Sequence, residues 1–196
     1  MNTYLIVDEQ SGVSAIVDPG AEPETILEQA KGTQVAVILI THGHPDHIGA
    51  LEEVRQATGA QVYMHSLEAQ NIGLAYDWAL NGGESIRLGE VDIMAIHTPG
   101  HTAGMLCYLL PPEPDGTWRA IVGDAIFVGG PGHTESPEAF ATTMRTMQEI
   151  IFLWPDDTIF YPGHGPSGKI GEERKAYEAF LSRGWEPDVQ GDVTWV

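Results

Sequence analysis

The sequence is poor in cysteine: Cys107 is the only one among 196 residues. A single cysteine excludes an intrachain disulfide framework and a thiolate cluster for zinc, so a metal site must use histidine, aspartate and glutamate. Its apolar surroundings, GMLCYLL, predict a buried structural thiol. No apolar run approaches the roughly 20 residues that a membrane helix requires, and the first residues, MNTYLIVDEQ, do not resemble a signal peptide. We therefore expect a cytoplasmic protein with no membrane among its partners.

Positively charged residues are also scarce. Lysine and arginine number 9 and aspartate and glutamate 28, so the formal net charge is 9 − 28 = −19. Such a surface repels phosphate backbones and lacks a basic patch, which excludes nucleic acid as a partner. It also disfavours binding to anionic membranes. We attribute most of the acidity to solubility and a smaller part to carboxylates that face a cation.

The hydrophobic pattern predicts a single domain over residues 1–196, built from short strands with helices between them. We expect strands within residues 3–8, 14–20, 35–40, 61–64, 104–110, 119–128 and 158–165, and a hairpin over 85–101 that turns at Gly89. We expect helices over residues 21–32, 136–154 and 171–184, and one that ends at Gly59. The sequence shows no long parallel βα repetition, and the pattern predicts a layered α/β fold.

One stretch, ILITHGHPDHIGALEEV, concentrates polar side chains directly after an aliphatic run. His42 and His44 are two residues apart, so at the end of an extended strand both rings project to the same side. Pro45 then interrupts the extended chain, and Asp46 and His47 point in a new direction at the start of the next helix. The pattern HxHxDH therefore favours a metal site over a chance cluster, and one peptide could supply two neighbouring ions.

Three further polar residues stand at strand ends or beside glycines: His101 in HTPGHTAG, Asp124 in VGDAIF and His164 in YPGHGP. Loops held by a rigid scaffold are where ligands are expected. Together with the cluster they make five histidines and two aspartates. Two ions with three or four protein ligands each would use this set fully, with one carboxylate as a bridge.

The remaining histidines are weaker candidates. His65 and His97 lie in or next to predicted strands, and we interpret both as structural. His133 follows glycines in GGPGHTES, and it is open whether it lies in the substrate pocket or on the surface. We keep it as a candidate substrate-binding residue.

The motifs THGHPDHIGA, TPGHTAG, GDAIF and YPGHG, in this order, resemble those of the metallo-β-lactamase superfamily. NTYLIV and AIVDPG resemble its early strands, and the glyoxalase II-like branch, the hydroxyacylglutathione hydrolases and their short bacterial relatives, is the most similar. The resemblance implies an αββα sandwich with a dinuclear metal site at one edge. Its ligands would be His42, His44 and His101 for the first ion, Asp46, His47 and His164 for the second, and Asp124 as the bridge.

The resemblance further implies a hydrolase of small thioesters or esters that uses two divalent ions, zinc or, as an alternative, iron. A metal-bound hydroxide would attack the carbonyl, and zinc would stabilise the departing thiolate. Asp46 would be both a ligand and a catalytic residue. No serine or cysteine nucleophile is needed for such a reaction.

Two features of the sequence differ from the family pattern. Glyoxalase II enzymes carry a C-terminal helical domain whose basic residues hold glutathione, and this chain has few cations to replace them. Arg174 and Lys175 are the nearest, and we expect them on a solvated helix face. Relatives commonly have Gly-Arg shortly after the GD motif, where this chain has Gly132 and His133. We also expect the usual first strand to be absent or shortened, because the chain begins almost at NTYLIV.

Other functions remain open. Persulfide dioxygenases resemble this branch and use one iron, for which His42, His101 and Asp124 would make a facial triad. A lactonase would differ only in the pocket. A nuclease of the superfamily is disfavoured by the charge of −19, and a binding module with a purely structural metal by the lack of thiolates. The acyl group, the thiol and the oligomeric state are not predictable from the sequence.

Overall fold

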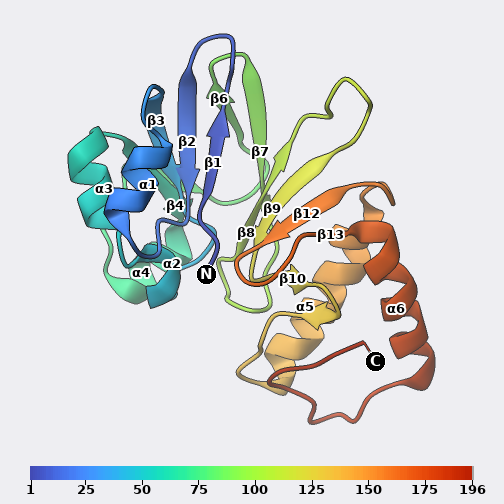
Figure 1. Ribbon diagram of the computed structural model, residues 1–196. Coiled ribbons are helices and arrows are strands. Elements are labelled where there is room, and N and C mark those ends of the chain that lie inside the picture. Colours follow the sequence, from blue (N-terminus) through green and yellow to red (C-terminus); the bar gives the residue numbers. More distant parts are fainter. Residues whose placement is uncertain (196) are drawn as a thin grey trace.

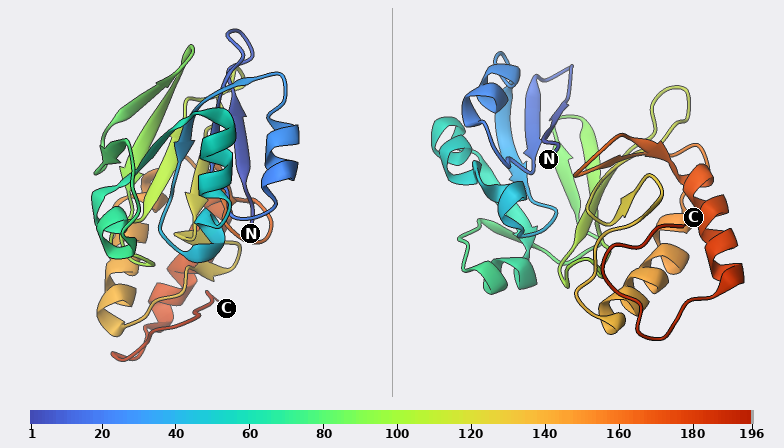
Figure 2. Two further views of the ribbon diagram at one scale, coloured as in Figure 1. Left: turned by 90° about the vertical axis from the view of Figure 1, so that its left-hand side faces the viewer. Right: turned by 60° about the horizontal axis from the view of Figure 1, so that its bottom comes forward.

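Two β-sheets lie face to face, and helices cover their outer faces, in the computed structural model (Figure 1). The structure describes residues 1–195, so Val196, the last residue of the predicted domain, lies outside the described part. The views in Figure 2 show the sheets as inner layers and the helices as outer layers. This order confirms the predicted α/β fold, an αββα sandwich. Within residues 1–195, no helix is both long and apolar enough to cross a membrane.

The first sheet has five strands, which follow one another in space as they do in the chain: β1 (Tyr4–Val7), β2 (Val13–Val17), β3 (Gln34–Leu39), β4 (Gln61–His65) and β5 (Trp78–Leu80). Only β1 and β2 are antiparallel; the other neighbours are parallel. The connections carry α1 (Pro23–Gln29), α2 (Pro45–Ile48), α3 (Leu51–Thr58) and α4 (Ser66–Ile72). The expectation of no long parallel βα repetition is therefore wrong for this half of the molecule.

The second sheet is mainly antiparallel, with β9 and β12 as its one parallel pair among the described residues. Its strands, in spatial order, are β13 (Gly168–Lys169), β12 (Ile159–Pro162), β9 (Arg119–Gly123), β8 (Leu106–Leu110), β7 (Val91–His97) and β6 (Ser85–Leu88). Outside it lie α5 (Pro137–Glu149), the 3₁₀ turn η1 (Ile151–Leu153) and α6 (Ile170–Arg183). A small ribbon of β10 (Ile126–Phe127) and β11 (Gly130–Pro131) completes this half.

Apolar side chains fill the three interfaces between the layers. Val37 and Leu39 of β3 meet Ile93 and Tyr108 of the second sheet in the middle cluster. A second cluster lies between the first sheet and the helices α1, α3 and α4, and a third between the second sheet and the helices α5 and α6. Because both sheets are covered on both faces, functional side chains are restricted to the edges and loops.

The long helix of the second half begins as predicted. The Ser136 side chain accepts a hydrogen bond from the Ala139 N–H at 3.1 Å, and Phe140, Met144 and Met147 are buried as the predicted apolar face. The predicted helix over residues 136–154 is nevertheless interrupted at Ile150, after which the chain continues as η1.

One predicted strand needs correction, and further elements were not predicted. The predicted strand over residues 119–128 breaks after Gly123, whose φ of 47° turns the chain out of the ladder and leaves Asp124 in a turn. The helix α4 and the strand β5 were not predicted at all. The cap of α4 is His65, outside the usual set of capping residues, and β5 has only three residues.

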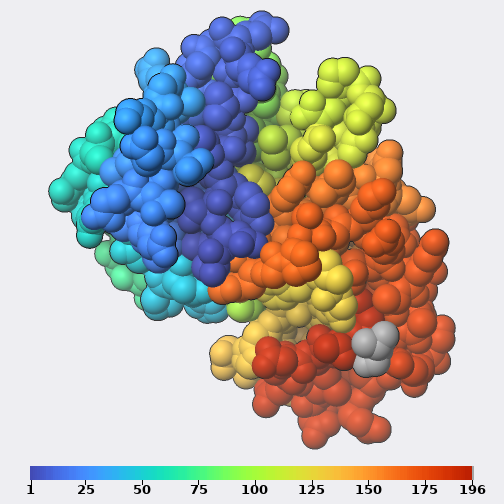
Figure 3. All heavy atoms as spheres, viewed as in Figure 1, coloured from blue at the N-terminus to red at the C-terminus, as the bar shows by residue number. Residues whose placement is uncertain are grey.

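The N-terminal segment supports the loop that follows β12. The backbone N–H of Asn2 donates to the Gly163 carbonyl at 2.6 Å, and the Asn2 side chain and the Tyr4 hydroxyl donate to the Pro162 carbonyl. Figure 3 shows this blue segment against the orange one. The ends of the two sheets are thereby held together beside His164.

Candidate metal centre

The structure brings all seven predicted metal ligands to one edge of the sandwich. The first four follow β3, with His42 and His44 in the extended segment and Asp46 and His47 in the first turn of α2. The other three come from separate loops of the second half: His101 follows β7, Asp124 follows β9 and His164 follows β12. Pro45 is the first residue of α2, so the predicted change of direction at this proline is confirmed.

Three histidine nitrogens converge in the first group. The Nε2 atoms of His42 and His101 lie 3.1 and 3.0 Å from Nδ1 of His44, and all three ligand atoms lie within 4.8 Å of one another. Nδ1 of His101 lies 2.8 Å from the His133 carbonyl and must donate to it, because a carbonyl only accepts. Nε2 of His101 therefore presents a lone pair to the group.

Asp18, which the sequence did not single out as a functional residue, sets the tautomers of two ligands. Its buried carboxylate accepts from the Thr41 N–H at 2.8 Å, the Thr41 hydroxyl at 2.6 Å and Nδ1 of His47 at 2.9 Å. Since the Thr41 hydroxyl proton points to Asp18, Nδ1 of His42 must donate to the Thr41 oxygen, at 3.0 Å. In their neutral forms, both His42 and His47 thus direct an Nε2 lone pair away from Asp18.

The second group consists of Asp46, His47 and His164, whose ligand atoms also lie within 4.8 Å of one another. Nε2 of His164 lies 2.9 Å from Oδ2 of Asp46, and Nε2 of His47 lies 3.8 Å from the same oxygen. The side chains of Asp46 and His164 are about half exposed, at 53% and 44%, whereas His47 is buried. The second group therefore lies nearer to solvent.

Asp124 lies between the two groups. Its Oδ1 is 3.3 Å from Nε2 of His47, and its Oδ2 is 3.8 Å from Nε2 of both His101 and His164. Oδ1 of Asp124 and Nε2 of His47 are both buried and make no hydrogen bond. Buried polar atoms are rarely left unpaired, and a cation between a carboxylate and a histidine lone pair would satisfy both. The residues therefore fit divalent metal ions, and the role of each as a ligand stays a prediction.

Burial and neighbouring groups shift the pKa values of four residues of the centre, in different directions. Burial, reinforced by the neighbouring histidines, holds the pKa of His42 well below its usual value, and burial also lowers the pKa of His101. Burial opposes protonation of His47 as well, yet Asp124 and Asp18 raise its pKa to about 10. Although burial raises the pKa of Asp46, the nearby His47 is the main cause that brings it below its usual value. A proton at His47 occupies the place that a metal ion would fill.

Three other histidines lie outside the two groups. The side chain of His133 is 44% exposed and contacts Asp192 and Glu135, at 3.0 and 3.5 Å. It contributes its carbonyl to His101, and substrate contact by its side chain stays a prediction. His65 and His97 stack at 4.6 Å, which agrees with a structural role for both.

Cys107 belongs to neither group of predicted metal ligands. It is fully buried, and burial raises the pKa of its thiol to about 12. This agrees with the structural role predicted for it and excludes a thiolate nucleophile at neutral pH.

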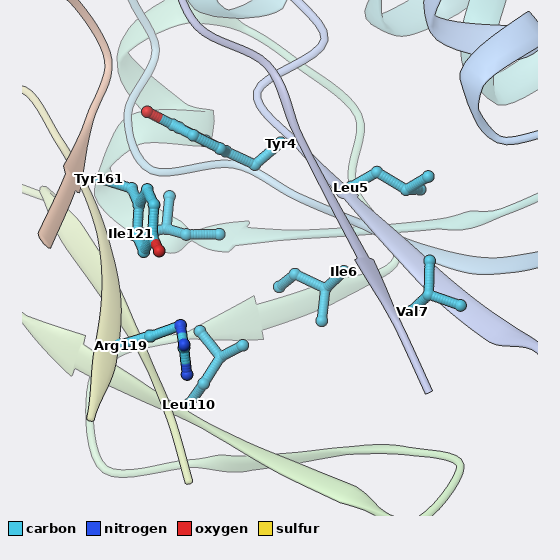
Figure 4. A pocket seen from close by; sticks show the side chains of 8 residues that line it. All are labelled: Tyr4, Leu5, Ile6, Val7, Leu110, Arg119, Ile121 and Tyr161. Carbon is cyan, nitrogen blue, oxygen red and sulfur yellow. The ribbon is translucent and has the colours of Figure 1, made fainter. Parts of the chain in front are cut away.

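Two cavities differ in their relation to the centre. One of about 420 Å³ adjoins Asp46, and Glu22 and Ile26 also line it. The other, of about 280 Å³, lies between β1 and the second sheet, where Tyr4 and Tyr161 meet edge to face (Figure 4). None of the seven predicted ligands lines the second cavity, whereas Asp46 lines the first.

Comparison with known proteins agrees with this arrangement. The family model described as the metallo-beta-lactamase superfamily matches residues 2–164, which include all seven side chains of the centre. The hydroxyacylglutathione hydrolase GloC of Haemophilus influenzae is 30% identical over 196 residues, which cover 89% of this chain and 90% of that protein.

Two solved structures extend the comparison. ETHE1 from Myxococcus xanthus is 28% identical with a TM-score of 0.75 and covers 88% of this chain and 76% of its own. TTHA1623, in a di-iron-bound form, is 29% identical with a TM-score of 0.68 and covers 89% and 92%. The fold is thus similar to that of ETHE1 and to that of a protein solved in a di-iron-bound form.

Proposed function

The chain belongs to the metallo-β-lactamase superfamily, and from this premise we propose that it is a dinuclear zinc hydrolase of small thioesters. The family and its hydroxyacylglutathione hydrolase relatives support the broader class, a metal-dependent hydrolase of ester or thioester bonds. One observation carries the finer proposal: Asp124 lies within 3.8 Å of histidines from both ligand groups, and its Oδ1 and Nε2 of His47 are buried without a hydrogen-bond partner. We propose further that residues 1–196 act as one domain in the cytoplasm.

Each residue of the centre has a distinct part in the proposal. His42, His44 and His101 would hold the first ion, Asp46, His47 and His164 the second, and Asp124 would contact both. When bound, such ions lower the pKa of water and polarise a carbonyl oxygen. The histidine and carboxylate donors, with no thiolate among the described residues of the centre, support an open catalytic site rather than a closed structural one.

The chain itself prepares the site for substrate. Asp18 and the His133 carbonyl fix the ring orientations of the ligands that they contact. Asp46 is proposed as a catalytic residue because its half-exposed carboxylate borders the cavity of about 420 Å³, where it can accept a proton from an incoming nucleophile. The acidic lining that Glu22 and Asp46 give this cavity favours a small neutral substrate over a polyanion.

An iron-dependent persulfide dioxygenase is the second candidate. His42, His101 and Asp124 would supply its two histidines and one carboxylate, and His101 and Asp124 already approach to 3.8 Å. The likeness to ETHE1 supports this alternative, and the di-iron form of TTHA1623 shows that iron occupies a similar fold. Zinc remains the first choice because thioester hydrolysis needs no redox-active metal.

The test is elemental analysis of the protein purified without added metal, followed by assays on a thioester, a lactone and a persulfide. We expect close to two zinc ions per chain and thioester hydrolysis that His44→Ala abolishes. Oxygen uptake with glutathione persulfide by iron-loaded protein alone would favour the dioxygenase instead. Well under one ion per chain, together with unchanged hydrolysis in the variant, would exclude both.

A further inference from the structure

Glu68, on the unpredicted helix α4, joins the two loops that carry the histidines of the first group. Its Oε2 accepts the Gly43 N–H at 2.9 Å, and its Oε1 accepts the Gly104 N–H at 2.8 Å. Gly43 lies between His42 and His44, and Gly104 comes three residues after His101. We infer that Glu68 is a positioning residue that sets the distance between the two loops and so preforms the three-histidine site. This inference rests on the proposed metal centre.

The Glu68 carboxylate lies close to both loops because its two hydrogen-bond donors, Gly43 and Gly104, have no side chain. A Cβ atom added at Gly104 would lie 2.8 Å from Cγ of Glu68 and 2.8 Å from Nδ1 of His65. A Cβ added at Gly43 would lie 3.1 Å from Ile72 and 3.2 Å from Oε2 of Glu68. The space between the loops is therefore fitted to one carboxylate, and a bulkier backbone would move one loop away from the other.

The helix that carries Glu68 is itself held in place. His65, at its N-cap, accepts the Leu67 N–H at 3.1 Å on Nδ1, and its ring stacks on His97 of β7. The Glu68 side chain is buried, with 4% of the residue exposed, so neither of its two hydrogen bonds competes with bulk water. Hydrogen bonds to a carboxylate are stronger than those between neutral groups. Glu68 thus fixes both loops against a rigid element.

The chain offers a matched control in Glu84. Its carboxylate also accepts two backbone N–H groups, from Asn81 at 2.9 Å and Gly82 at 2.8 Å. Those residues form a turn before β6 that carries none of the seven ligands. Replacing either glutamate by glutamine keeps the size of the side chain but turns an NH₂ group toward one of the donors, which removes one hydrogen bond. A change specific to Glu68 therefore reports on the metal site rather than on the loss of such a bond in general.

The experiment compares Glu68→Gln and Glu84→Gln in the full-length protein. Affinity for Zn²⁺ is measured by competition with a chromophoric chelator, and the site geometry by the absorption spectrum of the Co²⁺-loaded protein. Thermal unfolding of the metal-free proteins measures stability separately. We expect Glu68→Gln to bind one ion about 10-fold more weakly, the lower end of the effect of outer-shell residues, and to alter the Co²⁺ spectrum. Glu84→Gln should leave both unchanged.

Gly104→Ala approaches the same contact from the opposite side and serves as the second variant, should Glu68→Gln not fold. It should weaken the same ion and alter the same spectrum. Zinc affinity and a Co²⁺ spectrum equal to those of the parent, in whichever of these variants folds, would overturn the positioning role even if stability falls. A parent protein that binds no ion would instead overturn the proposed function, and this inference with it, before any variant is compared.

Discussion

The two sheets contribute to the centre in different ways. The first sheet supplies four side chains from the six residues His42–His47 at the end of β3, whereas the second supplies His101, Asp124 and His164 from three separate loops. Each group of three takes two members from the first sheet and one from the second, and Asp124 lies between the groups. Neither sheet alone supplies all three members of either group, so the predicted centre lies where the two sheets meet.

The largest effect is expected from Asp124→Asn, which removes the shared carboxylate. If Asp124 serves both ions, the affinity of each should fall by more than about 100-fold, beyond the range of outer-shell variants. Chelator competition and elemental analysis measure this, with the exposed Asp188→Asn as the control. Loss of one ion alone would show that Asp124 contributes to only one of the two groups.

Removal of both ions should loosen the junction of the sheets. A ligand that binds only the folded state at 100 times its Kd contributes about 2.7 kcal/mol to stability. Because two ions are removed, the free energy of unfolding should fall by twice this amount, about 5.4 kcal/mol, when a chelator removes Zn²⁺ present at 100 times the Kd of each site. Chemical denaturation with and without chelator measures it, and equal values in the two conditions would show that the ions do not join the two halves of the molecule.

Asp18→Asn tests the contribution of the first sheet. The aspartate orients His47 directly and His42 through Thr41, so one substitution should weaken both ions by about 10- to 100-fold. Zn²⁺ competition measures this, and the isosteric side chain preserves the packing. An effect on the second ion alone would mean that the Thr41 relay to His42 is unimportant.

The last test is the pH dependence of the metal-free protein. The pKa of His47 is raised in the folded state to about 10, so its proton stabilises the fold. This stability is fully present below the unfolded pKa of about 6.5 and is lost as the pH rises through about 10.

Denaturation of the chelated protein between pH 6 and pH 10 should show this loss. The zinc-loaded protein should lack it, because the ion displaces the proton. If the stability of the metal-free and the zinc-loaded protein changed with pH in the same way, the proton and the metal ion would not compete for His47.

The difference between the sheets also explains what the sequence could predict. His42, His44, Asp46 and His47 form a local pattern, and their strand and helix follow from it. His101, Asp124 and His164 were predictable as candidates from their positions at strand ends, and the resemblance to the family placed them together. Asp18 and Glu68 carry no such pattern. Their roles arise from hydrogen bonds to residues that are distant in sequence. Thr41 is 23 residues from Asp18, and Gly43 and Gly104 are 25 and 36 residues from Glu68.

The fold shows the same limit. Layers, the cap at Ser136 and the turn at Gly89 follow from local periodicity and from the chemistry of capping and turn residues. The parallel order of β2 to β5 depends on which strands pair, and pairing is decided by burial between the sheets rather than by any single strand. The strand breaks before Asp124 because Gly123 adopts a left-handed backbone conformation. The apolar residues around it are typical of a strand and do not reveal this conformation.

The spread of the ligands from residue 42 to residue 164 has a consequence for how the chain folds. Contacts distant in sequence form late because their loop-closure entropy must be overcome first. The stretch His42–His47, in contrast, holds four of the seven predicted ligands within six residues, so it would be available to an ion before the rest of the chain folds. An ion captured there would stabilise the unfolded chain and reduce the net gain from the finished centre. If the predicted ligands hold the ions, insertion of the metal after the two sheets have docked would give the larger net gain in stability.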